Sequence, residues 1–304
     1  MREFKLSVMS IMALGLSVGA ALTPATARGQ IFVANEGGGT IGEYNLDGTT
    51  VNASLVSGLS SPIPIAVSGS DLFVANESSG TIGEYTTSGA TVNASLVSGL
   101  PVNTIGGIAV SGLDLFVSSA NGIGEYTTSG ATVNPSLISL NVNELGLAAS
   151  GSDLFATNGS AIFEYTISGA AVNPSPLISG LNDAGGISVS GTNIFVVNEV
   201  SDPNNHSGTI GEYTTSGATV NASLLTGLNS PSGTAVFGSD LFVGSLDADT
   251  IGEYTTSGAT VNASLVSGLN APTGIVVVPE PSAWALLGIA AAALLAFRPR
   301  RSRA

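Results

Sequence analysis

Short apolar stretches alternate with turn-forming residues along most of the chain. Between residues 65 and 100, the apolar runs IAV and LFVAN are followed by TIGEYTT and ATVNASLVSGL. Turn residues separate these runs: SGSD at 68–71, ESSG at 77–80 and Ser88-Gly89. Runs of about four to eight residues bounded by Gly, Ser, Asn and Asp are typical of β-strands. This stretch therefore predicts four short antiparallel strands, with a two-residue hairpin at Ser88-Gly89.

The four-strand pattern recurs along the chain. The segment TIGEYTTSGATVNASLVSGL occurs at residues 81–100 and again, unchanged, at 250–269. A period near 40 residues with four strands per period is typical of a β-propeller blade. We therefore predict an all-β fold over residues 28–278, a six-bladed β-propeller of four-stranded antiparallel blades. A Glu before a recurring Tyr marks each unit, at intervals of 41, 41, 39, 48 and 41 residues: Glu43, Glu84, Glu125, Glu164, Glu212 and Glu253.

The two ends of the repeat array predict how the ring closes. The first unit opens at Ile31 with IFVAN and lacks the first strand of the pattern, whereas PTGIVVV at 272–278 follows the last unit. We expect this C-terminal segment to supply the missing strand, with residues 275–278 paired beside residues 31–35. A linear array would instead need polar caps at both ends. The pattern of GIAV, SGSDLFVAN and IGEY resembles NHL-type propeller repeats, which implies the fold but no particular function.

The body of the chain has no cations, so apolar burial and backbone hydrogen bonds must hold it together. Residues 30–278 contain no Lys or Arg and nineteen of the 21 acidic residues, a formal charge of −19. Nucleic-acid binding depends on cations that neutralise phosphates, so this charge excludes it. The chain has no Cys, which excludes disulfides and thiol chemistry. All seven cations lie near the ends: Arg2, Lys5, Arg28, Arg298, Arg300, Arg301 and Arg303.

The N-terminal residues have the three parts of a secretory signal peptide. The start, MREFK, carries basic residues, LSVMSIMALGLSVGAAL is apolar, and TPATA contains small residues. Ala25 and Ala27 fit the A-x-A pattern that precedes cleavage. We expect a signal helix within residues 1–27 and cleavage after Ala27. The alternative is an N-terminal membrane anchor.

The C-terminal residues combine three features in a fixed order. Pro279-Glu280-Pro281 precedes an apolar run of 15 residues at 283–297. As a helix this run would be about 22 Å long, which is short for a hydrocarbon core of about 30 Å, although flanking residues and a thinner bilayer can compensate. Cations beyond the run stay on the cytoplasmic side, so we expect the body to lie outside. These cations are Arg298, Arg300, Arg301 and Arg303.

This order of features resembles the PEP-CTERM sorting signal, over residues 279–304. The resemblance implies that the apolar run forms a transmembrane helix, that an exosortase-type membrane enzyme recognises the tail, and that the tail is cut near the PEP motif. The body would then reach the cell surface or the extracellular space, with exopolysaccharide or other surface proteins as partners. Similar tails are also named after ice-binding proteins, a name that says nothing about the body. A plain tail anchor is the alternative.

The candidate catalytic groups are few. His206, the only His, lies in the insertion DPNNHSG and has no visible acid–base partner, so we expect a solvated loop residue. One His without Cys excludes a Cys/His zinc site. The six Glu of the repeat should have similar environments far from one another, whereas catalysis needs unlike neighbours at one point. The six Tyr, one in each unit, should pack between blades.

Calcium is the only metal that the composition allows, because carboxylates are plentiful. No spacing matches a calcium loop, so we expect no metal, no cofactor and no catalytic residue. The sequence thus predicts an exported, non-catalytic propeller of the cell surface or extracellular matrix. The alternatives are a secreted calcium-dependent hydrolase or lactonase, and a protein-binding scaffold. The candidate calcium ligands are Asn35-Glu36, Asn76-Glu77, Asn198-Glu199, Asp202, Asp247 and Asp249.

Overall fold

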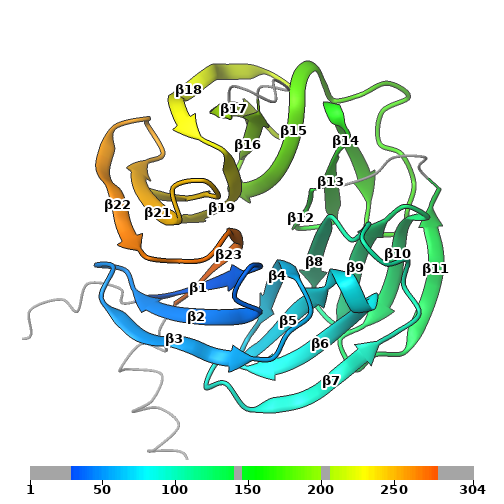
Figure 1. The fold of residues 1–304 in the computed structure, drawn as a ribbon. Coiled ribbons are helices and arrows are strands. Elements are labelled where there is room, and N and C mark those ends of the chain that lie inside the picture. The colour runs from blue at the N-terminus through cyan, green and yellow to red at the C-terminus, as the bar shows by residue number, and fades with distance from the viewer. Residues whose placement is uncertain (1–28, 140–145, 200–205, 280–304) are drawn as a thin grey trace, which may run out of the picture.

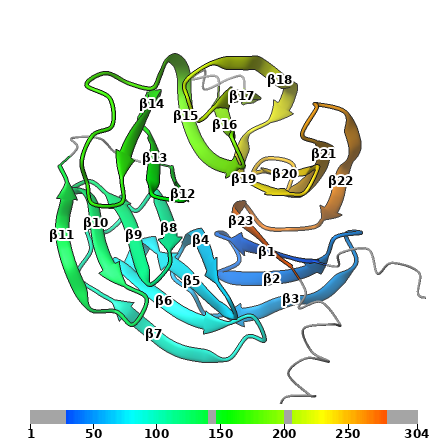
Figure 2. The same cartoon turned by 180° about the vertical axis from the view of Figure 1, so that it is seen from behind.

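Antiparallel β-sheets are arranged in a ring (Figures 1 and 2). The structure is a computed structural model and describes residues 29–139, 146–199 and 206–279. The segments expected to form the signal helix (1–27) and the transmembrane helix (283–297) lie outside these residues. Within the described residues, no helix is long and apolar enough to cross a membrane.

Four of the sheets have four strands each, and in each sheet the strand nearest the centre of the ring is named first here. One contains β23 (Pro272–Pro279), β1 (Gly29–Asn35), β2 (Thr40–Asn45) and β3 (Thr50–Ser57). The next contains β4 (Pro62–Ser68), β5 (Asp71–Asn76), β6 (Thr81–Thr86) and β7 (Thr91–Val97), with the short 3₁₀ helix η1 (Glu77–Ser79) after β5. Another contains β8 (Gly107–Ser111), β9 (Asp114–Ser119), β10 (Gly122–Thr127) and β11 (Thr132–Ile138). The last contains β19 (Pro231–Phe237), β20 (Asp240–Ser245), β21 (Thr250–Thr255) and β22 (Thr260–Ser267).

The fifth sheet has seven strands, which differs from the prediction of separate four-stranded blades. Its long strand β15 pairs with β14 near Ile178 and with β16 from Ala184 onward. Three other units have Pro at the position of Ala184, and their inner strands begin there. Pro has no N–H and is confined to strand starts or edges. Ala184 has an N–H, so β15 can continue through this position as one strand. The strands are β12 (Leu147–Ser150), β13 (Asp153–Thr157), β14 (Gly159–Thr166), β15 (Ile178–Ser190), β16 (Asn193–Glu199), β17 (Ser207–Thr214) and β18 (Thr219–Asn229).

The C-terminal strand closes the ring, as the repeat pattern predicted. β23 runs antiparallel to β1, and Ile275 pairs with Val33 while Val277 pairs with Ile31. The last pair joins Pro279 to Gly29. The two ends of the described chain therefore lie side by side on one edge of the first unit.

The predicted two-residue hairpin at Ser88-Gly89 is wrong, because the connection is longer. The Gly89 N–H donates to the Thr86 carbonyl at 2.9 Å, and the Thr86 N–H donates to the Ala90 carbonyl at 2.8 Å. Gly89 has φ of +85°, the left-handed conformation that follows a turn in hairpins with three-residue loops. The turn also reaches the preceding unit, since a Cβ on Gly89 would lie 2.7 Å from the Leu55 carbonyl oxygen. The corresponding contact across the closure joins Gly48 to Leu265.

The hydrophobic core is divided among the interfaces between neighbouring units. The described residues form six apolar clusters, and each cluster combines side chains from two adjacent units. Each cluster includes one buried Tyr, which confirms the predicted place of the Tyr residues. The Tyr85 ring covers Gly83, where a Cβ would lie 2.7 Å from the ring. In the fourth unit Phe163 replaces this Gly and stacks on Tyr165, with ring centroids 6.5 Å apart.

Candidate functional site

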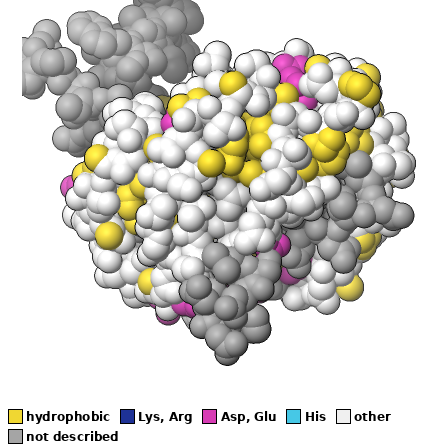
Figure 3. All heavy atoms as spheres, turned by 90° about the horizontal axis from the view of Figure 1, so that it is seen from above, with side chains coloured by type: hydrophobic (Ala, Val, Ile, Leu, Met, Phe, Trp, Pro, Cys, Tyr) yellow, Lys and Arg dark blue, Asp and Glu magenta, His cyan; other side chains and the backbone are white. Residues whose placement is uncertain are grey.

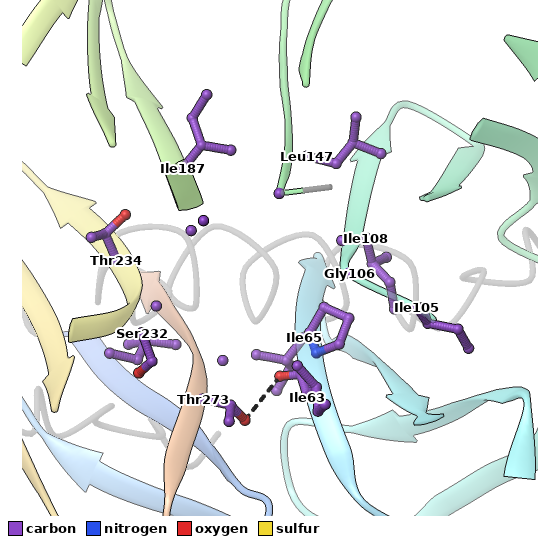
Figure 4. A pocket seen from close by; sticks show the side chains of 18 of the residues that line it. Ile63, Ile65, Ile105, Gly106, Ile108, Leu147, Ile187, Ser232, Thr234 and Thr273 are labelled. Carbon is purple, nitrogen blue, oxygen red and sulfur yellow. Dashed lines mark hydrogen bonds between the residues drawn. The ribbon is translucent and has the colours of Figure 1, made fainter. Parts of the chain in front are cut away.

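The inner strands of the units enclose a central channel with a cavity at each end. The larger cavity has a volume of about 530 Å³ and opens where the inner strands begin (Figure 4). The smaller has a volume of about 320 Å³ and lies toward the other end. The two cavities share one ring of residues, here called the waist, which is aliphatic except for one Thr. The waist consists of Ile65, Ile108, Leu147, Ile187, Thr234 and Ile275.

The two faces of the ring carry different connections. Turns between second and third strands lie on the side of the larger cavity, where the Glu77 N–H donates to the Ser61 carbonyl at 3.0 Å. We call this side the mouth face. On the opposite side, the Thr87 N–H of the outer hairpin donates to the Ser70 carbonyl at 2.8 Å. We call that side the hairpin face.

Glycines form the wall of the larger cavity just above the waist. A Cβ on Gly186 would lie 2.4 Å from the Ser232 carbonyl oxygen, and one on Gly274 would lie 2.3 Å from that of Ile63. Such distances are too short for any side chain, so neighbouring inner strands meet there backbone to backbone. The cavity wall at these positions is therefore peptide backbone, whereas Pro64 stands at the equivalent position of the second unit.

The hydroxyl groups of the cavity already donate hydrogen bonds within the wall. Ser232 Oγ donates to the Pro272 carbonyl oxygen at 2.6 Å, and Thr273 Oγ1 donates to the Pro62 carbonyl oxygen at 3.1 Å. Their oxygens, like the backbone carbonyls, remain as acceptors. The Thr234 hydroxyl at the waist donates to Ser188 Oγ at 3.0 Å, and the other labelled side chains in Figure 4 are aliphatic.

The structure brings three of the candidate calcium ligands to the larger cavity. Glu36, Glu77 and Glu199 line it from the ends of second strands and are half-buried. Glu36 Oε1 accepts a hydrogen bond from Ser61 Oγ at 2.9 Å. The cavity thus has aliphatic walls and a carboxylate rim.

The Asn residues that precede these Glu have a different role. Asn35, Asn76 and Asn198 are buried, with exposed fractions of 4%, 4% and 8%. Each interacts with the Tyr of its own unit: burial raises the pKa of Tyr44, and a side-chain hydrogen bond with Asn35 opposes that rise. Asn76 acts in the same way on the pKa of Tyr85. These amides support the aromatic core beneath the mouth face.

Neither Asp247 nor Asp249 lines the larger cavity. Asp249 Oδ1 accepts the Ala271 N–H at 2.8 Å, and Asp202 lies outside the described residues. Asp247 contacts His206 Nδ1, so the expectation that His206 has no partner is wrong. Asp247 lies 41 residues along the chain, and only the folded loops bring the two together. Among the described residues, no group of three or more His, Asp or Glu side chains could hold a metal ion.

The six repeated Glu do not share one environment, contrary to expectation. Burial raises the pKa of each of them. A neighbouring Asp raises the pKa further in four units, as Asp71 does for Glu84. In the fifth unit Asn193 stands at the Asp position, and its Nδ2 donates to Glu212 Oε1 at 2.9 Å. Glu43 and Glu212 are the two that are buried, with 6% and 7% of their surface exposed.

The residues predicted for export and sorting lie at the ends of the chain. Pro279 is the last residue of β23. The others lie outside the described residues: Ala25, Ala27, Glu280, Pro281, Arg298, Arg300 and Arg301.

Comparison with known protein families decides the nature of this tail. Residues 277–301 match the PEP-CTERM protein-sorting motif. The match spans the Pro-Glu-Pro sequence, the apolar run and the first Arg residues. The PEP-CTERM motif marks an exported protein that a membrane enzyme of the exosortase type processes. No curated protein sequence matches the chain.

Solved structures share the fold of the body. A chain in a nidogen/laminin complex is 13% identical, with a TM-score of 0.63, and the alignment covers 82% of this chain and 98% of that one. Virginiamycin B lyase from Staphylococcus aureus is 20% identical, with a TM-score of 0.54 and coverage of 81% and 84%. A protein of unknown function from Desulfotomaculum acetoxidans is 13% identical, with a TM-score of 0.55 and coverage of 83% and 99%. Identities this low show the fold alone, which is β-propeller-like.

Proposed function

We propose that this chain is an exported, non-catalytic propeller protein of the cell surface or extracellular matrix. The PEP-CTERM motif at residues 277–301 is the observation that carries the proposal. In this proposal a signal peptide cut after Ala27 starts export. The apolar run at 283–297 then holds the chain in the membrane until an exosortase-type enzyme processes the tail. Exopolysaccharide or other surface proteins are the proposed partners of the released body.

We infer that the body is a ring of six blades. Four sheets correspond to one blade each. The seven-stranded sheet corresponds to two blades that share β15, whose first half is the outer strand of one unit and whose second half is the inner strand of the next. The six sequence units and the six apolar clusters between them support this count.

The composition of the larger cavity supports a non-catalytic body. Catalysis needs unlike polar groups that meet around one reacting atom. Here the walls are aliphatic side chains and backbone, and the hydroxyl groups already donate within the wall. Three carboxylates at the rim offer one kind of chemistry. The described residues that line the cavity include no His or Lys, and the Ser61 hydroxyl beside Glu36 donates to that carboxylate.

The carboxylate rim favours one alternative, a calcium-dependent hydrolase. Thermal unfolding of the purified protein in EDTA, calcium or magnesium at equal ionic strength separates the two proposals. A specific ion at a hundredfold excess over Kd would stabilise the folded state by about 2.7 kcal/mol, a rise of several degrees for a domain of this size. We expect no difference between calcium and magnesium. A rise with calcium alone, lost when Glu199 becomes Ala, would favour the hydrolase.

Charge reversal in the tail tests the sorting proposal directly. Changing Arg298, Arg300 and Arg301 to Glu removes the cations that hold the tail on the cytoplasmic side. We expect the variant to stay unprocessed in its host, as seen by cell fractionation and the mass of the chain. Changing the same three residues to Lys keeps the charge and should leave processing unaltered. Normal processing of the Glu variant would contradict the proposal.

A further inference from the structure

The PEP-CTERM motif begins inside the folded body. Its first three residues, 277–279, belong to β23 and pair with residues 29–31 of β1. Three residues then separate Pro279 from Ala283, where the apolar run starts, so Ala283 lies four residue steps beyond Pro279. Four extended residues span about 14 Å at most. No linker therefore lies between the closing strand and the proposed membrane segment.

The path of β23 shows which face of the ring the tail leaves. Thr273, near the start of β23, lines the larger cavity at the mouth face. Ile275 lies at the waist, and Val277 lines the smaller cavity beyond it. Pro279 therefore lies at the hairpin face, at the place where other units have the turn between their inner and second strands.

The N-terminal end leads to the same place independently. Gly29 pairs with Pro279, and the predicted cleavage site after Ala27 lies only two residues before Gly29 in the sequence. Both apolar terminal segments of the precursor thus connect to one edge of the hairpin face.

We propose that the hairpin face is the membrane-proximal face of this protein, held against the lipid bilayer surface, with the cavity mouth directed away from it. This inference rests on the proposed function, in which residues 283–297 cross the membrane. The short connection keeps Pro279 within about 14 Å of the bilayer. The ring adds about 20 Å, the length of a six-residue strand such as β5, between its two faces.

The described residues supply no electrostatic attraction to a bilayer, so we infer that the tether holds the hairpin face in place. Asp71, Asp114, Asp153 and Asp240 begin the second strands at that face. The described residues include no Lys or Arg, and the side of the molecule seen in Figure 3 shows acidic and hydrophobic side chains without any dark-blue cation. Anionic lipids attract basic segments and repel an acidic surface. Cleavage of the tail should therefore free the body from the bilayer.

The absence of Cys from the chain allows a direct test with single-cysteine variants. Ser70 and Ser239 are exposed on the hairpin face, and Ser78 is exposed on the mouth face. Each is changed to Cys in the mature chain that keeps its tail, labelled with the fluorophore NBD and inserted into phosphatidylcholine vesicles. Half of the vesicles carry a spin label on the lipid headgroup as a quencher. We expect at least twofold stronger quenching at Ser70→Cys and Ser239→Cys than at Ser78→Cys.

Two further readouts separate the ways in which the proposal could fail. Chains that float with the vesicles but show equal quenching at all three positions, or the strongest quenching at Ser78→Cys, overturn the orientation and leave the sorting proposal intact. Chains that do not float with the vesicles overturn both. Quenching at Ser70→Cys should be unchanged between about 0.1 M and 1 M salt, because a tether is not screened. A loss of quenching at the higher salt would show that charge holds the face instead.

Discussion

The inner and outer edges of the units contact their neighbours in different ways. At the inner edge, neighbouring strands meet backbone to backbone, and a Cβ on Gly233 would lie 2.2 Å from the Thr273 carbonyl oxygen. At the outer edge, five consecutive residues of β7 are exposed, and Val92 has 55% of its surface in solvent. The next unit approaches the outer strand at hairpin glycines such as Gly89, while the buried end of the strand, such as Val97, joins the apolar cluster between units. We infer that the inner edge carries most of the sensitivity to substitution.

The largest expected effect comes from filling the contact between inner strands. Gly186→Ala places a Cβ 2.4 Å from the Ser232 carbonyl, a backbone atom that cannot yield easily. Overpacking of this kind costs about 3 kcal/mol, so we expect the melting temperature to fall by about 6–12 °C. The adjacent Gly185 is the matched control, because no atom lies within 4 Å of a Cβ there. Equal melting temperatures for Gly186→Ala and Gly185→Ala would contradict the role assigned to the inner edge.

A smaller loss is expected at the hairpin contact. Gly89→Ala forces Ala into a left-handed conformation and places a Cβ 2.7 Å from the Leu55 carbonyl. We expect about 2 kcal/mol of destabilisation in urea unfolding. Gly69 has φ of +59° with open space around a Cβ, so Gly69→Ala measures the backbone strain alone. If both variants lose the same stability, the contact with the preceding unit contributes nothing.

The third strands, between the two edges, should make stability depend on pH. Burial raises the pKa of every repeated Glu in the folded state, so folding favours the protonated form. The stability that these groups contribute is fully present below about pH 4.3, the unfolded pKa of Glu, and is lost as pH rises through the folded pKa values. We therefore expect a higher melting temperature near pH 4.5 than near pH 7.5.

Asn193→Asp should enlarge this dependence. The change replaces a hydrogen bond to Glu212 with charge repulsion, at a cost of about 1–2 kcal/mol near pH 7.5 and less at pH 4.5. Asp240→Asn makes the reverse change beside Glu253, whose pKa is raised first by burial and then by Asp240. This variant should show a weaker dependence of the melting temperature on pH. If the melting temperatures of both variants and of the parent protein change equally between pH 4.5 and pH 7.5, the residue at the Asp position does not govern the pKa of these carboxylates.

The smallest effect is expected at the outer edge itself. Val92→Ala removes two methyl groups from an exposed side chain and should change stability by less than about 0.5 kcal/mol. Val97 lies in the same strand but is 95% buried, with 5% of its surface exposed. Val97→Ala should therefore cost about 2 kcal/mol. A comparable loss at both positions would mean that the exposed part of the outer strand is packed in solution.

The repeat pattern was sufficient to predict the ring closure and the place of the Tyr residues. Both depend on periodic apolar positions, which a single sequence displays directly. The pattern did not predict the continuous β15, because that depends on Ala184 where other units have Pro. It also did not predict that the repeated Glu form two classes, with and without a neighbouring Asp. The available signal was Gln30 and Asn193, which stand where the other four units have Asp.

The candidate site was predicted less completely than the fold. The sequence indicated Glu36, Glu77 and Glu199 but not their meeting at one cavity, because the topology of the ring decides which strand ends converge. The contact between His206 and Asp247 joins two loops whose conformations follow from no periodic pattern. The tail was predictable because the order of its three parts is itself the signal.

The pairing of β23 with β1 has a mechanical consequence. If the tail anchors the protein and the body is pulled away, the force enters at Pro279 and runs along β23. The hydrogen bonds of an antiparallel pair lie perpendicular to the strands. This load therefore acts in shear on all the residue pairs from Gly29–Pro279 to Asn35–Pro272 at once. Strands loaded in shear share the force among all their hydrogen bonds, whereas strands peeled apart break these bonds one after another. The strand that closes the ring is therefore also attached to the body in the geometry that best resists a pull on the tail.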